Sequence, residues 1–345
     1  MPDLPARPDL DQLRHQAKDL LQAAHRGEAA ALARIRAVSD RLILADAQLA
    51  LAREYGFTSW ARLKAEVERR EILDDRDVGR LIALLAQDSG LAVAELEHWR
   101  DHPGGAAPLN YVAMLRFDTA RHRWRDVTGT AAMARALLAA GAQADGDPGD
   151  RETPLMTAAS YGDAEVAKVL IEAGASLEAT AAPDAGGVPG GTALLHAAVF
   201  GMTDVVDLLV AAGAQIPDLV LAAAAGDLTG WPVAEAPQET RILALIMAAQ
   251  HERVNAVNQL VAVGTPVDAV DVAWGRHALR VAAEHGRPES VRTLLAHGAD
   301  PSLRDWQGRT ALDLCRSGAA NHPGRAGHAQ VEAILEALGD DRPTE

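Results

Sequence analysis

The feature that most constrains this chain is a stretch that is written twice, at residues 153–174 and again at residues 192–213. In each copy a Thr is followed by a pair of alanines and a Gly, and a second Gly closes the copy. The spacing within each copy is kept although an insert rich in Gly and Pro lies between them. A spacing preserved around an insert indicates a repeat architecture, in which each copy is one structural unit.

Each copy predicts two helices. Pro154 lies in the first turn of the first helix, where a missing N–H group costs nothing. Gly162 ends that helix, and Asp163 is placed to cap a second helix whose apolar residues fall on one stripe. Gly174 then ends the second helix as a left-handed cap. The predicted unit is therefore helix, turn, helix, loop.

This unit resembles the ankyrin repeat, whose pattern reads approximately G-x-T-P-L-H-x-A-A-x-x-G, then an amphipathic helix, then G-A-D. The resemblance implies an all-α fold, an ankyrin-type α-solenoid of stacked helix-turn-helix repeats. The family's His after Pro-Leu is replaced here, and the resemblance therefore implies that its hydrogen bond is lost; the replacing residues are Met156, Leu195, Arg280 and Asp313. Further copies are GRHALRVAAEHGRPESVRTLLAHGAD at 275–300 and GRTALDLC at 308–315, with weaker ones at 107–142 and 242–268.

Residues 1–70 predict a helical N-terminal cap. Its motif AREYGFTSWARLK is similar to leaders found ahead of ankyrin repeats in some bacterial proteins, with Thr58 or Ser59 as a helix cap and Phe57 and Trp60 as apolar anchors. A solenoid needs a terminal element with a polar outer face, which favours a cap over a ligand site. The remaining expected parts are a degenerate first repeat at 71–104, the solenoid at 105–338 with inserts at 118–128, 180–190, 218–240 and 317–329, and a disordered tail at 339–345.

Composition excludes several classes of function. With 48 acidic and 33 basic residues the formal charge is −15, so a nucleic acid would be repelled. No run of 18 apolar residues occurs and the start lacks a basic-then-apolar leader, so we expect a cytoplasmic protein without a membrane partner. The strong preference for Arg over Lys is typical of a GC-rich bacterium. Because Cys315 is the only cysteine, a disulfide framework is excluded.

No standard catalytic motif is present: the sequence lacks G-x-S-x-G, a phosphate-cradling G-x-x-x-x-G-K, H-E-x-x-H and paired C-x-x-C. His251 and His285 share one register position in neighbouring repeats. Stacked helices lie roughly 8–10 Å apart, which disfavours a shared metal ion. We therefore expect neither a metal nor a cofactor.

The resemblance also implies a binding surface. In the ankyrin family, the end of each first helix and the hairpin before each Thr line a concave face that contacts partners. The sequence thus predicts a recognition scaffold, with a protein as the favoured partner, because aromatic and Arg side chains concentrate interface energy. The positions carried over from the family are Tyr161, Phe200, His251, Glu284 and His285 at helix ends, and Trp274, Arg276, Trp306 and Arg309 in hairpins.

A second hypothesis remains open, in which the protein binds a small molecule or is an enzyme. The long inserts would narrow the concave face into a pocket that holds His251, Glu284, His285 and Glu152 as acid–base groups. The 118–128 insert interleaves Trp124 with basic residues, a pattern that contacts acidic partners or phosphates, although one short loop is weak evidence. A closed pocket would favour chemistry, and an open groove a protein partner.

Overall fold

The computed structural model describes residues 4–5, 8–96, 106–118, 121, 123–323 and 326–340. The chain divides into two compact units, which we describe separately. Unit 1 comprises Met1–Val112 and Gly129–Gln143, and unit 2 comprises Ala113–Thr128 and Ala144–Glu345. Residues 97–104 of the expected degenerate repeat, His122, and residues 341–345 of the expected tail lie outside the described residues.

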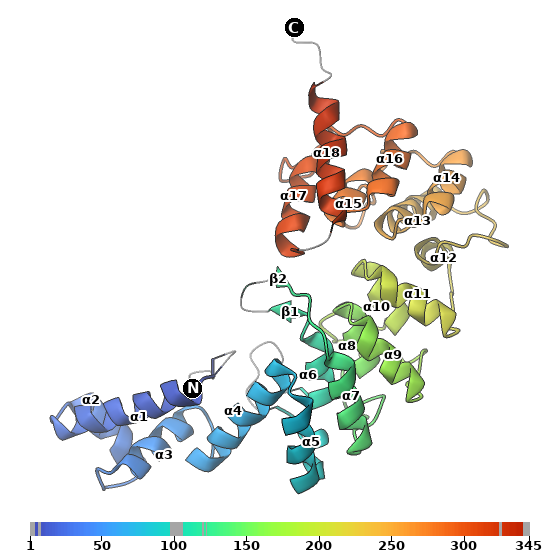
Figure 1. Ribbon diagram of the computed structural model, residues 1–345. Helices are drawn as coiled ribbons and strands as arrows, with labels where there is room; N and C mark the ends of the chain where they lie inside the picture. The colour runs from blue at the N-terminus through green and yellow to red at the C-terminus, as the bar shows by residue number, and fades with distance from the viewer. Residues whose placement is uncertain are drawn as a thin grey trace. The chain divides into compact units, whose positions relative to one another are not determined.

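Four helices occupy the N-terminal part of unit 1 (Figure 1): α1 (Leu10–His25), α2 (Ala29–Arg36), α3 (Leu44–Glu54) and α4 (Trp60–Asp75). Their apolar faces enclose two small cores, one of which contains Leu13, Phe57 and Leu63. The expected cap of α4 is confirmed at Ser59, whose side chain accepts a hydrogen bond from the Arg62 N–H group at 3.2 Å.

Unit 1 also buries charge. Glu66 on α4 forms ion pairs with Arg69 at 2.8 Å and Arg70 at 3.1 Å, and all three side chains are almost fully buried. Arg69 additionally donates to the carbonyl groups of Ala94 and Glu95. The remaining elements are α5 (Val78–Gln87), the 3₁₀ helix η1 (Ser89–Ala92), α7 (Thr130–Ala139), which packs on α5, and α6 (Pro108–Met114), which runs into unit 2.

Unit 2 contains the clear repeats (Figure 1). The first helices are α8 (Pro154–Ser160), α10 (Ala193–Val199), α12 (Leu219–Ala225), α13 (Gln238–Gln250), α15 (Ala278–Glu284) and α17 (Ala311–Asn321), and each packs on the next. The second helices are α9 (Ala164–Glu172), α11 (Thr203–Ala211), α14 (Val254–Ala262), α16 (Pro288–Ala296) and α18 (Gly327–Asp340). The last of these, α18, ends at Asp340, inside the tail expected at 339–345.

Local signals explain these helices. The Thr153 hydroxyl accepts a hydrogen bond from the Met156 N–H group at 3.3 Å, and the Asp163 carboxylate accepts one from Val166 at 3.0 Å. Gly174 has φ of +86°, the left-handed conformation expected after α9. Alanine pairs at the contact between first helices, such as Ala158–Ala159, are fully buried, which lets neighbouring helices approach closely.

The inserts take different forms. The 218–240 insert begins with α12 and continues as a loop, so the expected loss of a second helix is confirmed. The 118–128 insert belongs to a short antiparallel hairpin, β1 (Phe117–Asp118) and β2 (Arg123–Trp124), in which Phe117 lies opposite Trp124.

Buried histidines join neighbouring repeats of unit 2. The His196 ring is within 2.8 Å of the Ser160 hydroxyl, and the His251 ring is within 2.9 Å of the Ala198 carbonyl oxygen. At the family's His position, Arg280 donates to the Gly275 carbonyl group at 3.1 Å. The expected loss of a hydrogen bond from that position is therefore wrong for this repeat, because the longer guanidinium reaches the hairpin.

Candidate functional site

The hairpin before α15 projects an indole into water. Asp271 closes this hairpin. Its carboxylate accepts a hydrogen bond from the backbone N–H group of Trp274 at 2.7 Å, and from the backbone N–H group and Nε of Arg276 at 2.9 and 3.2 Å. Trp274 is 75% exposed and Val272 is 90% exposed. Arg276, which was predicted to contact a partner, is thus held by Asp271 at the base of an exposed apolar tip.

The hairpin before α17 repeats this design. Asp305 accepts hydrogen bonds from Gln307 at 2.9 Å and from the backbone and side chain of Arg309, both at 2.8 Å. Partial burial opposes ionisation of Asp305, but these hydrogen bonds outweigh it and lower the pKa of the carboxyl group. Trp306, next to Asp305 in the sequence, is 83% exposed. Two consecutive hairpins therefore present tryptophans on rigid supports.

The two aromatic residues at the helix ends differ in their surroundings. Phe200, after α10, is 37% exposed and lies near the ring of His196. Tyr161, after α8, is half-buried, with its ring centroid 5.9 Å from that of Phe117 and 6.1 Å from that of Trp124. Tyr161 thus supports the β1–β2 hairpin, which its register position did not predict.

His251 does not lie on the surface that was predicted to contact a partner. Its side chain is 1% exposed, and its two ring nitrogens lie 2.9 Å from the Ala198 carbonyl oxygen and 3.0 Å from the Thr203 hydroxyl. Burial, aided by the charges of Arg287 and Arg253, lowers the pKa of His251 to about 3. A neutral, buried imidazole with both nitrogens bonded joins repeats and is not available to a partner.

The other proposed acid–base residues have separate surroundings. Glu152 accepts a hydrogen bond from the Gly187 N–H group at 3.1 Å, within the 180–190 insert. Glu284 is exposed as a residue, but partial desolvation of its carboxyl group by neighbouring protein atoms raises the pKa of that group. His285 alone of the four lines the pocket described next. The insert pocket therefore does not bring the four predicted acid–base residues together.

Two inserts from opposite ends of unit 2 meet. The Trp124 ring on β2 stacks on the His322 ring beyond α17, with centroids 5.2 Å apart and planes inclined by 11°. β2 and α17 are also in contact (Figure 1). Beneath this bridge lies a cavity of about 370 Å³, which we call the insert pocket. Its lining comes from the β1–β2 hairpin, the α8–α9 and α15–α16 turns, the start of α11, and residues 322–323.

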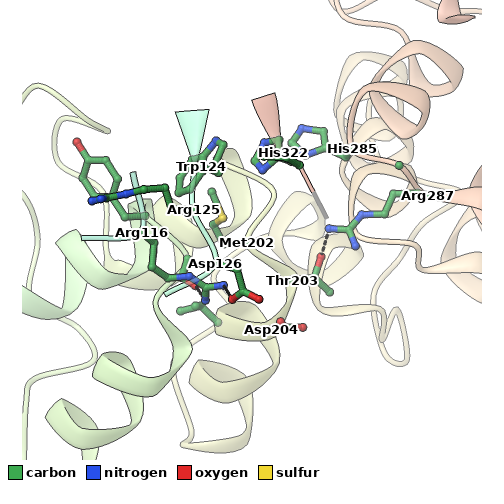
Figure 2. A pocket seen from close by; sticks show the side chains of 15 residues that line it. Arg116, Trp124, Arg125, Asp126, Met202, Thr203, Asp204, His285, Arg287 and His322 are labelled. Carbon is green, nitrogen blue, oxygen red and sulfur yellow. Dashed lines mark hydrogen bonds and ion pairs between the residues drawn. The ribbon is translucent and has the colours of Figure 1, made fainter. Parts of the chain in front are cut away.

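Three arginines, Arg116, Arg125 and Arg287, are among the residues that line the insert pocket (Figure 2). Arg116 donates to the Gly162 carbonyl group at 2.8 Å, and Arg125 donates to the Leu115 carbonyl group at 2.8 Å. Arg287 donates to the carbonyl groups of Gln250 and Gly201 and, at 2.7 Å, to the Thr203 hydroxyl. These hydrogen bonds hold each guanidinium group against the backbone of a neighbouring segment, and Arg116 also lies 3.8 Å from the Asp126 carboxylate.

Sequence analysis missed most of the insert pocket. The basic pattern around Trp124 was noticed, but Arg116, Arg287 and His322 were not selected. The signal available for Arg287 was its place directly after the His285–Gly286 turn, next to a predicted contact position. For His322 the sequence offered only its position in an insert.

Within the described residues, no group of three or more His, Cys, Asp and Glu side chains is arranged to hold a metal ion. None of the helices in the described part of the chain is both long and apolar enough to cross a membrane.

Comparison with known proteins gives short matches among relatives. Human espin-like protein is 45% identical over 58 residues, or 17% of this chain and 6% of the relative. The E3 ubiquitin-protein ligase hecd-1 of Caenorhabditis elegans is 46% identical over 59 residues, again 17% of this chain but 2% of the relative. An ankyrin repeat-containing protein of Treponema pallidum (strain Nichols) is 31% identical over 119 residues, or 34% of each chain. The chain thus spans between 2% and 34% of the length of these relatives.

Among solved structures, the human ASB11 ankyrin repeat domain matches 80% of this chain and 98% of its own, with 24% identity and a TM-score of 0.38. A family profile described as ankyrin repeats (3 copies) matches residues 127–218 and 238–322, which is just over half of the chain. These two segments contain the capped helix pairs and closed hairpins described above. The chain therefore belongs to the ankyrin-repeat family.

Proposed function

We propose that this chain is a recognition scaffold that binds a protein partner, with the hairpin tips of unit 2 as its principal contact surface. The observation that carries the proposal is the exposure of Trp274 and Trp306, 75% and 83%, on consecutive hairpins. Ankyrin repeats generally mediate protein–protein interaction, which supports the same conclusion.

Physical considerations favour a protein over other partners. Large apolar groups left in water tend to mark a contact site, and tryptophan is enriched among the residues that dominate binding energy. Because Asp271 and Asp305 already hold the hairpins closed, little conformational entropy is lost when a partner binds. The net charge of −15 opposes a nucleic acid.

The proposal extends to other residues carried over from the family. Phe200 and Glu284 would contact the partner from the helix ends, and Arg276 and Arg309 from the bases of the hairpins. The acid–base alternative is not retained, because His251 is buried and His285 alone of the four residues lines the insert pocket. The bacterial, cytoplasmic setting expected from the sequence stays a prediction, and it determines which lysate is used to find the partner.

A test compares binding by the wild type with binding by the double variant Trp274→Ala, Trp306→Ala. After capture of a partner from a cytoplasmic lysate, its affinity for each purified protein is measured by calorimetry. We expect each truncation to cost about 2 kcal/mol or more, which is roughly 30-fold in affinity per residue. Ile82→Ala serves as the matched control, since Ile82 is also an exposed apolar residue, 55% exposed, but lies on α5 in unit 1.

Two results would overturn the proposal. One is an affinity that is unchanged in the double variant, which would move the contact surface elsewhere. The other is an equal loss of affinity in Ile82→Ala, which would show that binding follows general surface hydrophobicity. Circular dichroism of each variant verifies that the helices are intact.

A further inference from the structure

We propose that the protein partner binds unit 2 through a basic, extended segment in which Lys or Arg residues are interspersed with apolar residues. This inference rests on the proposed function for the contact with the tryptophans, and it adds the charge of the partner. The juxtaposition that carries it is a row of loops with exposed carboxylates at its beginning and exposed apolar side chains at its end. These loops, which we call the loop row, precede α8, α10, α12, α15 and α17, at residues 144–153, 173–192, 212–218, 263–277 and 297–310.

Hydrogen bonds between the loops show that neighbouring loops lie side by side. In each case a carboxylate in one loop accepts a hydrogen bond from a backbone N–H group in the next loop. The three pairs, with the carboxylate first, are Asp145–Ser176 at 2.7 Å, Glu178–Gln215 at 2.8 Å and Asp268–Asp300 at 3.0 Å. The first helices that follow the loops also pack in chain order. A partner segment that follows the loop row therefore passes its loops in turn.

The negative charge of the chain is concentrated near the beginning of the loop row. Residues 144–240 contain 15 of the 48 acidic residues but only two of the 33 basic ones. The rest of the chain is nearly neutral, with 33 acidic and 31 basic residues. Within the row, loop 144–153 has four acidic residues and one basic residue, loop 173–192 has two acidic residues and no basic one, and loop 297–310 has two of each. The potential is therefore most negative at the beginning of the row.

Four acidic residues in the first two loops are exposed: Asp145, Asp147, Glu178 and Asp184. Asp184 forms an ion pair at 3.2 Å with Arg151, which is the only basic residue of these two loops. Acidic side chains therefore outnumber basic ones on this surface even when this pair is counted. Positive charges on a partner would be steered towards them, and this attraction weakens as the salt concentration rises.

The end of the loop row is apolar and nearly neutral. Val272, Trp274 and Trp306 project into water from the last two loops. The guanidinium groups of Arg276 and Arg309 are paired with carboxylates of the same loops. The face of an indole attracts ammonium and guanidinium groups as well as apolar side chains. A basic segment with apolar residues therefore suits both ends of the row, whereas an acidic segment or a purely apolar one suits at most one end.

The size of the loop row sets the length of the segment. Five steps lead from α8 to α17 along the first helices, and packed helices lie roughly 8–10 Å apart, which gives a path of about 40–50 Å. An extended chain covers about 3.3 Å per residue, so a segment of about 12–15 residues follows the whole row. A second copy of this chain is a less favourable occupant, because two chains with a charge of −15 repel each other.

The experiment titrates synthetic peptides of about sixteen residues into the full chain by calorimetry, at about 20 and about 150 mM salt. The four peptides repeat the sequences Gly-Arg-Leu-Ser, Gly-Gln-Leu-Ser, Gly-Glu-Leu-Ser and Gly-Arg-Ser-Ser. Because the repeats within a peptide are identical, binding does not require one particular register. The set separates the contribution of charge from that of the apolar side chains.

Two triple variants separate local charge from total charge. The loop variant removes three exposed carboxylates from the loop row but keeps the oxygen atoms that accept the hydrogen bonds between loops. The matched control removes three exposed carboxylates from unit 1 and changes the net charge by the same amount. The substitutions are Asp145→Asn, Asp147→Asn and Glu178→Gln in the loop variant, and Asp19→Asn, Asp40→Asn and Asp75→Asn in the control.

We expect the peptide with Arg and Leu to bind at low salt, and the loop variant to weaken this binding at least about fivefold, because it loses three attractive charges. The difference should shrink at the higher salt concentration, and the control should stay within about twofold of the wild type. The peptide with Gln and the peptide without Leu should each bind more weakly, since one lacks the charge and the other the apolar contact. Melting curves verify that the variants fold.

Three outcomes would overturn the inference. They are no binding of the peptide with Arg and Leu, equal affinity for the peptide with Glu, and equal losses in the loop variant and the control. Sedimentation velocity of the protein alone tests the other occupant. A dimer that dissociates in the loop variant would replace the basic partner by a second copy of this chain.

The double variant Trp274→Ala, Trp306→Ala distinguishes this inference from the proposed function. If it binds the peptide with Arg and Leu like the wild type while the loop variant binds more weakly, the role of the hairpin tips is rejected and the basic partner is retained. The opposite pattern rejects the basic partner and leaves the proposed function intact.

Discussion

Leu170 and Trp306 are both large apolar residues of unit 2, yet Leu170 is fully buried on α9 and Trp306 is 83% exposed on a hairpin. The buried leucine belongs to the contact between neighbouring repeats, on which the stability of a repeat protein depends. The exposed tryptophan rests on a turn that Asp305 closes without help from the indole. Stability and the proposed recognition therefore depend on different residues of unit 2.

The largest expected effect concerns the buried side of this comparison. Leu170→Ala or Leu209→Ala should lower the free energy of unfolding by roughly 2–5 kcal/mol, because each removes a fully buried side chain and leaves a cavity. Urea denaturation followed by circular dichroism measures the change. Lys168→Ala, at an exposed position of the same helix as Leu170, is the control. Losses below about 1 kcal/mol in both leucine variants would contradict the proposed role of the inter-repeat core.

A glycine beside the insert pocket should be the next most sensitive position. Gly201 has φ of +71°, and a Cβ atom there would lie 2.6 Å from Nδ1 of His285. Gly201→Ala should therefore cost about 2–4 kcal/mol, from the backbone conformation and the crowding together. Gly213→Ala isolates the first effect, because Gly213 also has a positive φ but open space around it, and should cost about 1–2 kcal/mol. Equal melting temperatures for the two variants would show that the His285 side chain moves aside without an energetic cost.

Acidification should weaken the buried histidine contacts. The pKa of His251 is about 3 in the folded protein and ordinarily 6.5, so only the unfolded chain takes up a proton between these values. The contribution of neutral His251 to the free energy of unfolding is therefore complete above pH 6.5 and decreases towards pH 3. At pH 5 the loss amounts to about 2 kcal/mol. Between pH 7 and pH 5, the free energy of unfolding should fall by about 2 kcal/mol more in the wild type than in His251→Gln. Denaturation curves at the two pH values measure this difference. Parallel pH profiles would exclude this role for His251.

The smallest expected effect lies on the exposed side of the comparison. Trp306→Ala should change the free energy of unfolding by no more than about 0.5 kcal/mol, because the indole is largely in water and the hairpin is closed by Asp305. The same denaturation experiment measures this variant beside Leu170→Ala. A loss above about 1 kcal/mol would mean that the tip supports the fold, and the separation of the two roles would fail.

Most of the fold could be predicted because its signals are local. Thr153, Asp163 and Gly174 each act within a few residues of their own position, as a cap or a turn, and the structure uses all three as predicted. The exposure of Trp274 and Trp306 also agrees with the hairpin positions carried over from the ankyrin family. Where the family pattern was broken, as at Arg280, the sequence indicated a missing contact but not the longer side chain that replaces it.

The insert pocket could not be predicted, because its parts meet through contacts that no local pattern encodes. His251 and His285 occupy equivalent positions, but His251 finds the Ala198 carbonyl group and Thr203, whereas His285 lines the cavity. Such differences depend on which acceptors the preceding repeat presents. The pairing of Trp124 with His322 is still further from sequence reasoning, since repeat logic relates each unit only to its neighbours.

The Trp124–His322 stack also changes how unit 2 can move and fold. In an ordinary repeat array, the terminal repeat frays independently, and contacts join only residues that are near in sequence. Here the stacked rings of Trp124 and His322 are about 200 positions apart in the sequence, so neither end of unit 2 can open without breaking this stack. Closing so long a loop is entropically costly, which makes it a late event in folding. A ligand that stabilises the Trp124–His322 stack would therefore reduce the opening of all the repeats between the two rings. Hydrogen exchange would then slow together at both ends of unit 2.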